Sequence, residues 1–76
     1  MPRYFFDVDD GKRQVLDPNG AVFIDNAAAV QEAVSMLSSL REIRVLEDRP
    51  GTTTVNVRNE DGESVFAGSA QLDDAE

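Results

Sequence analysis

The stretch that decides the fold is NAAAVQEAVSMLSSLREIRVLE, residues Asn26 to Glu47, because its apolar residues recur at helical spacing. The i, i+3, i+4, i+7 pattern is typical of an amphipathic helix with one buried side. The segments before and after it alternate as strands do, so we predict one central helix packed on a sheet. The predicted stripe consists of Val30, Ala33, Val34, Leu37 and Leu40, widened by Met36 and Ile43.

Local signals mark both ends of this helix. Asp25 is the expected N-cap, because its carboxylate can accept hydrogen bonds from the free N–H groups of the first turn. At the other end, Arg49-Pro50-Gly51 stops the helix, since proline cannot continue it. The helix is therefore expected to end between Leu46 and Asp48.

The N-terminal segment predicts a β-hairpin. Arg3 to Asp9 alternates as a strand, and Asp10-Gly11 is typical of a two-residue turn. Such a turn places Val15 on the core face of the sheet and leaves Phe5 and Leu16 together on the opposite face. The expected pairs are Asp9 with Lys12, Phe6 with Val15, and Phe5 with Leu16, with Tyr4, Phe6 and Val8 facing the helix.

Asp17-Pro18-Asn19-Gly20 then predicts a turn, since each residue suits its position in one. The apolar run from Ala21 to Ile24 is either a short strand or a buried approach to the helix, and periodicity does not decide between them.

A second hairpin follows the helix, with strands at Thr52–Arg58 and Glu63–Ala70 around the turn Asn59–Gly62. A loop of two or of four residues gives the same parity, which places Val55, Val57 and Phe66 on the core face. Val65 and Ala67 are expected on the opposite face.

These elements predict an α+β domain in which two hairpins flank the helix, in the order ββαββ with a further short strand at 21–24 as the alternative. The domain spans residues 1–70, and the polar, acidic residues 71–76 are expected to form a disordered tail.

Composition excludes several classes of protein. The 76 residues carry a net charge of −8, which disfavours direct nucleic-acid binding through clustered Lys and Arg. No apolar run approaches the roughly 18 to 20 residues of a membrane span, and the N-terminus lacks the features of a signal peptide. We therefore expect a cytoplasmic protein with no membrane association.

Candidate catalytic chemistry is sparse. The chain has no His and no Cys, so neither a Ser-His-Asp nor a Cys-His arrangement can be built. Asp7, Asp9 and Asp10 with Gly11 do not fit a calcium-binding EF-hand loop, whose glycine and glutamate positions they miss. Arg41 and Arg44 are explained by the helix dipole and by pairing with Glu47 or Asp48, with an anion site as the alternative. We expect no enzyme activity, no metal site and no cofactor.

The opening M-P-R-Y-F-F-D-V-D-D-G, the Asp17-x-x-Gly20 turn, the Phe23-Ile24-Asp25 entry to the helix and the Asn59–Gly62 turn resemble a known family. It comprises short, uncharacterised bacterial proteins, mostly alphaproteobacterial, that begin M-P-R-[YF]-[FY]-F. The resemblance implies one compact domain of unknown function. Members often carry a histidine near the first turn, where this chain has Asp7 and Asp9, so no function that rests on an imidazole is expected.

Two kinds of partner follow from these expectations. The sheet face that the helix does not cover would carry Phe5, Leu16, Val65 and Ala67, and a contiguous apolar patch favours a homodimer interface. Singly exposed apolar residues, or coverage by residues 21–24, would explain the same pattern without an interface.

The second partner is a basic protein. It would meet an acidic surface that stands in for nucleic-acid phosphates, in a mimic or inhibitor of a nucleic-acid-binding protein. An antitoxin-like partner is a third alternative, which rests only on the analogy of a small strand-helix-strand domain. The acidic surface would consist of Asp7, Asp9, Glu60, Asp61 and Glu63.

Overall fold

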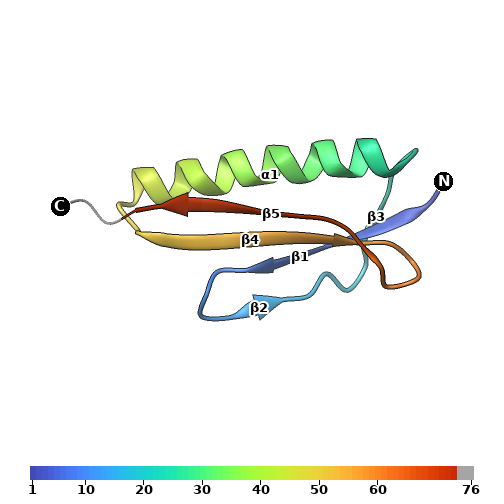
Figure 1. Cartoon of the computed structure of the whole chain (residues 1–76), viewed down its shortest axis with the longest axis horizontal. Helices are drawn as coiled ribbons and strands as arrows, with labels where there is room; N and C mark the ends of the chain where they lie inside the picture. The colour runs from blue at the N-terminus through green and yellow to red at the C-terminus, as the bar shows by residue number, and fades with distance from the viewer. Residues whose placement is uncertain (74–76) are drawn as a thin grey trace.

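The computed structural model describes residues 1–73 and shows an α+β fold, with one helix packed on an antiparallel sheet of five strands (Figure 1). The sheet order is β2-β1-β4-β5, and β3 pairs with the start of β1. The predicted class is confirmed, and the third short strand makes the element order βββαββ. The elements are β1 (Arg3–Asp9), β2 (Gln14–Val15), β3 (Ala21–Val22), α1 (Asn26–Leu46), β4 (Gly51–Arg58) and β5 (Ser64–Leu72).

The core lies between α1 and the strands beneath it. Val55 and Val57 of β4 are fully buried, and Tyr4, Ala29 and Ala33 complete the buried cluster. The inward positions predicted for Tyr4, Phe6, Val8, Val55, Val57 and Phe66 are confirmed, because these side chains belong to this cluster or pack against it. The partly buried side chains that pack against it are Phe6, Val8, Phe23, Met36, Leu37, Leu40, Val65 and Phe66.

The buried side of α1 is rotated from the predicted stripe. Ala29, Ala33 and Arg44 are buried, whereas Val34 and Ile43 are exposed. Small alanine side chains let the helix approach the sheet closely, so the two alanines and not the larger valines define the line of closest contact. The prediction was therefore wrong for Val34 and Ile43.

Both predicted helix ends are confirmed, and the C-terminal end is more elaborate than a proline stop. The Asp25 carboxylate accepts a hydrogen bond from the Ala28 N–H at 2.9 Å. At the other end, the Asp48 N–H donates to the Val45 carbonyl and the Arg49 N–H to the Arg44 carbonyl. Together with the positive φ of 51° at Asp48, these bonds form a Schellman motif.

The register of the first hairpin was predicted wrongly. Val8 pairs with Val15 and Asp9 with Gln14, which leaves a loop of four residues, 10–13. The wider loop forms because the Asp10 carboxylate accepts hydrogen bonds from the N–H groups of Lys12 and Arg13, an alternative to ladder bonds that aspartate favours in turns.

The second hairpin has the predicted face, because Val57 pairs with Phe66. A register shift at Val57/Arg58 adds one residue to β5, which accounts for Val65 packing with the core instead of lying opposite it. β5 also continues to Leu72, which pairs with Gly51, so residues 71 and 72 belong to the sheet and not to the tail. The tail prediction for residues 74–76 lies outside the described residues.

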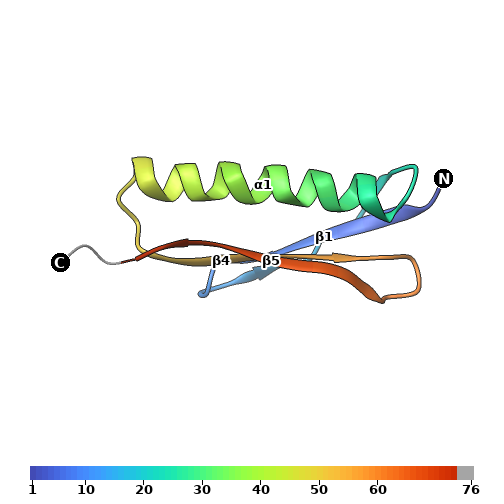
Figure 2. The ribbon, with the colours of Figure 1, turned by 45° about the horizontal axis from the view of Figure 1, so that its top comes forward.

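The helix does not cover the whole sheet. It packs mainly on β4 and β5 (Figure 2), covers Tyr4 at the start of β1, and leaves β2 exposed. Val15 shares the face of its partner Val8 but is 56% exposed, so its predicted core position was wrong. Beside the helix lies an apolar groove of about 270 Å³, lined by Val8, Glu32, Ser35, Met36, Ser39 and Leu40.

Asp48 offers a direct test of the helix end. A side chain in the left-handed region is strained, so we expect Asp48→Gly to raise the free energy of unfolding by about 0.5 to 1 kcal/mol. Urea unfolding at neutral pH measures it. Asp48→Ala is the matched control, because it removes the carboxylate but keeps Cβ; an equal gain from both variants would contradict the role of backbone strain.

Candidate functional site

A partly buried ion pair organises the sheet face that α1 leaves uncovered. Asp7 of β1 is 5% exposed and receives two hydrogen bonds from Arg58 of β4, from Nε at 2.6 Å and from Nη2 at 3.2 Å. The hydrogen bond to Asp7 raises the pKa of Arg58. The bidentate geometry fixes both side chains, as is typical of arginine with a carboxylate.

Asp17 links the loop after β2 to this pair. Its N–H donates to Asp7 Oδ1 at 2.9 Å, and its carbonyl accepts from Arg58 Nη2 at 3.3 Å. Its carboxylate accepts hydrogen bonds from the N–H groups of Gly20 at 3.0 Å and Phe6 at 3.1 Å. These bonds lower the pKa of Asp17, with the bond from Gly20 contributing most. Asp17 therefore holds the turn against the outer side of β1.

The four side chains predicted as an apolar interface lie in different environments and do not form one patch. The Arg58 guanidinium lies 4.8 Å from the centroid of the Phe5 ring, as a cation–π contact. Leu16 is exposed, and Ala67 is exposed on the uncovered face, where its partner is Asn56. Val65 packs against the core. The structure thus brings Phe5 and Ala67 to the expected face and moves Val65 away from it.

The rest of the uncovered face is polar. Thr54 and Ser69 lie within hydrogen-bond distance of each other at 3.3 Å, and the Ser64 hydroxyl donates to Asn56 at 2.6 Å. These four side chains therefore present hydrogen-bonded hydroxyl and amide groups on the uncovered face.

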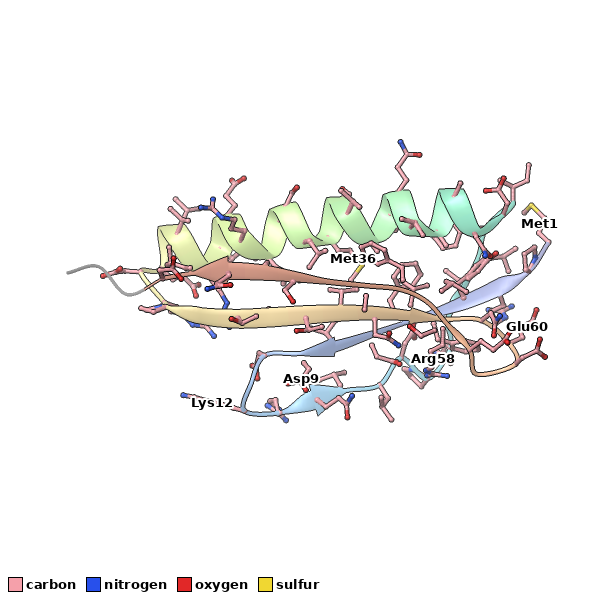
Figure 3. All side chains as sticks on the ribbon, in the orientation of Figure 1. Met1, Asp9, Lys12, Met36, Arg58 and Glu60 are labelled. Atoms are coloured by element: carbon pink, nitrogen blue, oxygen red, sulfur yellow. The ribbon has the colours of Figure 1, made fainter. Side chains whose placement is uncertain are left out.

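The five acidic residues predicted as one surface lie at different places. Asp7 is buried in its ion pair, and Asp9 lies at the far end of β1 from Glu60, as Figure 3 shows. Glu60 accepts a hydrogen bond from the Arg3 N–H, and Glu63 one from the Asn59 side chain. Glu60, Asp61 and Glu63 share the β4–β5 turn, and Asp7 and Asp9 are apart from them.

The outer edge of β5 is the longest free edge of the sheet. β5 is the last strand in the order β2-β1-β4-β5 and pairs only with β4. Its nine residues, SVFAGSAQL, contain no charge and no proline, which are the usual means of blocking an edge. The lack of charge and proline was visible in the sequence. The edge was not predicted, because the sequence pattern was used only to assign side chains to the two faces of the sheet.

An apolar stripe on α1 lies beside this edge. Leu37 points at β5, since a Cβ built on Gly68 would lie 2.7 Å from its Cδ1. The side of the helix toward β1 lines the groove beside Val8. By helical geometry, Val30, Val34 and Val45 lie on the other side, toward the free edge, and Val34 and Val45 are 49% and 47% exposed.

Arg44 differs from its predicted role. It is 5% exposed and donates to the Thr53 hydroxyl and to two loop carbonyls, those of Arg49 and Pro50. Among residues 1–73 it forms no ion pair, since Glu47 pairs with Arg49 instead. The predicted pairing of Arg44 with Glu47 or Asp48 was therefore wrong.

Within positions 1–73, no three Asp or Glu side chains gather in a way that could hold a metal ion. The single helix in that range is not long and apolar enough to cross a membrane.

These features define a small α+β domain with one helix, an ion-paired sheet face and a long free strand edge. The chain belongs to the family described as Domain of unknown function (DUF6894), whose model matches residues 3–71. No curated protein and no solved structure matches the chain. Any function must therefore be argued from the surfaces of this chain.

Asp17 makes a pH-dependent contribution to stability. Its pKa is lowered from 3.8 in the fold, so its stabilisation is present above that pH and is lost as the pH falls through the folded value. We expect Asp17→Asn to lower the free energy of unfolding by about 1 to 2 kcal/mol at pH 7, because the amide cannot accept all these bonds.

Chemical unfolding at several pH values measures this effect, and the difference from wild type should shrink below pH 3.8. Asp61→Asn is the control, because the Asp61 carboxylate accepts no hydrogen bond from residues 1–73. A difference that stays constant down to pH 2 would contradict the carboxylate as its source.

Proposed function

We propose that this protein is a non-catalytic protein-interaction module that pairs with a second copy of itself along the outer edge of β5. The observation that carries the proposal is the free, uncharged edge of nine residues. Unpaired N–H and C=O groups along such an edge form a template for another strand. In a homodimer, these free groups of β5 would form hydrogen bonds with β5 of the second copy.

The sequence of β5 suits pairing with itself. In an antiparallel pair about a twofold axis, each residue of one strand meets a residue of the same strand in the other copy. Like charges directly opposite each other destabilise such a pair, and Ser64–Leu72 has none. The two β4–β5 hairpins would then form the centre of one continuous sheet.

The position of α1 also favours this arrangement. A helix centred over β4 and β5 lies about one strand spacing, 4.8 Å, from the axis of the proposed dimer. The two helix axes would then be about 10 Å apart on the same face of the sheet, close to the usual distance between packed helices. Val34 and Val45, which are exposed in one copy, would lie on the side of α1 that faces the helix of the second copy.

The free edge is a better interface than the uncovered face on which the sequence analysis placed the dimer. Arg58 lies over Phe5, and hydrogen-bonded polar groups of β4 and β5 occupy much of that face. An interface there would bury polar groups whose bonds are already made and would gain little apolar area. We therefore place self-association at the edge.

The alternative of an acidic mimic or antitoxin-like partner receives less support. Mimicry of a phosphate backbone needs carboxylates on one surface, whereas Asp9 pairs with Thr54 in the middle of β4 and Glu60 lies in the β4–β5 turn, well apart from it (Figure 3). The absence of cysteine from the chain suits a reducing compartment, so we place the dimer in the cytoplasm.

Light scattering over a range of concentrations tests the dimer. We expect a mass of twice 8.3 kDa for the wild type, and a dissociation constant at least about tenfold higher for Val34→Lys and for Ala67→Lys, since each lysine meets its own copy near the axis. Both residues are exposed, so the folds should survive.

Gln14→Lys and Ser39→Lys are the matched controls. Gln14 lies on β2, the opposite edge of the sheet, and Ser39 is exposed on the side of α1 that faces the groove beside Val8, away from the valine stripe. Both variants should dimerise as the wild type does. A wild type that stays monomeric up to millimolar concentration, or equal weakening by all four lysines, would overturn the proposal.

A further inference from the structure

A hollow of about 580 Å³ lies at the end of the molecule where α1 stops. The β1–β2 turn and the α1–β4 loop line it, and Figure 3 shows Lys12 at this end. Three cationic residues, Lys12, Arg44 and Arg49, contribute to the lining, together with Asp10 and Asp48. This is an unusual concentration of positive charge in a chain of net charge −8.

Arg44 is the fixed part of this hollow. Its Nε donates to Thr53 Oγ1 at 3.0 Å, and its Nη1 donates to the carbonyls of Arg49 at 3.0 Å and Pro50 at 3.1 Å. Gly51 leaves room for the guanidinium, since a Cβ there would lie 2.9 Å from Nη1. The orientation of the guanidinium is therefore set before any ligand arrives.

Two N–H groups of Arg44 remain available, and its charge acts on one carboxylate at longer range: the N–H groups of Lys12 and Arg13 lower the pKa of Asp10 most, and the charge of Arg44 lowers it further. All three acceptors are neutral oxygens, and no carboxylate oxygen of residues 1–73 lies within 4.0 Å of the guanidinium. Nη2 has no hydrogen-bond partner in that range, yet no buried polar atom there lacks one, so Nη2 must keep contact with solvent. A guanidinium in a buried side chain that is partnered only by neutral groups favours an anion as its remaining partner.

We infer that this hollow binds a carboxylate group, held by Nη2 of Arg44 and by the ammonium group of Lys12. A single negative charge suits the lining, because Asp10 and Asp48 oppose a dianion and Arg49 is already paired with Glu47. Lys12 is exposed on the turn and can reach toward a bound oxygen on a flexible side chain.

The carboxylate has two sources. One is another molecule, such as a small carboxylic acid or an acidic peptide. The other is this chain itself, because Leu72 pairs with Gly51 at the hollow and the residues after it include Asp73, Asp74 and Glu76. Both sources present the same chemistry to Arg44, so one experiment with two arms separates them.

The test is an NMR titration of the full chain with sodium acetate, against sodium chloride at matched ionic strength. We expect saturable shifts of the Arg44 side-chain resonances and of the amides of Gly11, Lys12 and Gly51 with acetate only. Lys12→Gln should weaken binding about threefold, as expected for a solvent-exposed charge, and Arg44→Met should abolish it where its spectrum shows a folded chain.

The second arm uses the full-length variant Asp73→Asn/Asp74→Asn/Glu76→Gln. Equal acetate binding by this variant and the wild type assigns the site to an external carboxylate. Binding that appears or tightens only in the variant assigns it to the chain's own acidic residues. Shifts that stay linear, or that chloride reproduces, in both proteins would overturn the inference, as would acetate binding that Lys12→Gln and a folded Arg44→Met leave unchanged.

Discussion

The structure depends on one geometric limit, which is that a single helix covers only two strands. An α-helix is about 10 Å wide with its side chains, and strands are about 4.8 Å apart. Because α1 lies on β4 and β5, it covers β1 only in part: Tyr4 at its start is buried, whereas the outer strand β2 is exposed. The exposure of Val15 and the groove beside Val8 follow from this limit, and so does the position of the helix beside the free edge.

Polar contacts stabilise β2, β3 and the loop between them, which the helix does not cover. β2 and β3 have only two residues each, too few to be held by ladder bonds alone. The Asp7–Arg58 pair joins β1 to β4, and Asp17 binds both the pair and the backbone of Phe6. Removing Arg58 would leave the Asp7 carboxylate buried without a charged partner. The loop from β2 to β3 is thus held by three charged side chains in place of a second helix.

The sequence predicted the features that rest on local chemistry. Asp25 as N-cap, the region where the helix ends and the inward face of β4 each follow from a few neighbouring residues, and all were confirmed. The register of the first hairpin was not predictable in the same way. Whether Asp10-Gly11 forms a tight turn depends on competition between ladder bonds and the Asp10 side chain, which bonds two amides of the loop.

The surfaces were harder to predict because they depend on distant parts of the chain. Arg44 looked like an exposed residue of the last helical turn, since the pattern of α1 does not reveal that Thr53 and the loop carbonyls surround it. Likewise, a strand becomes an edge only through the order of the sheet. The lack of charge in Ser64–Leu72 was visible in the sequence, but its meaning required the knowledge that nothing pairs with the outer side of β5.

The two edges of the sheet differ in length, and this difference explains why edge pairing would give a closed dimer instead of a fibre. Pairing of β5 with β2 of another copy would leave new free edges and continue into a fibre. β2 offers only Gln14 and Val15 for such a contact, whereas β5 offers nine residues. The pairing of β5 with β5 therefore gains the most hydrogen bonds and uses up both long edges at once. Glu63 and Asp73 flank the strand and place charges beyond each end, which discourages pairing past the neutral segment. A closed pair is thus the arrangement in which this sheet leaves the least edge exposed.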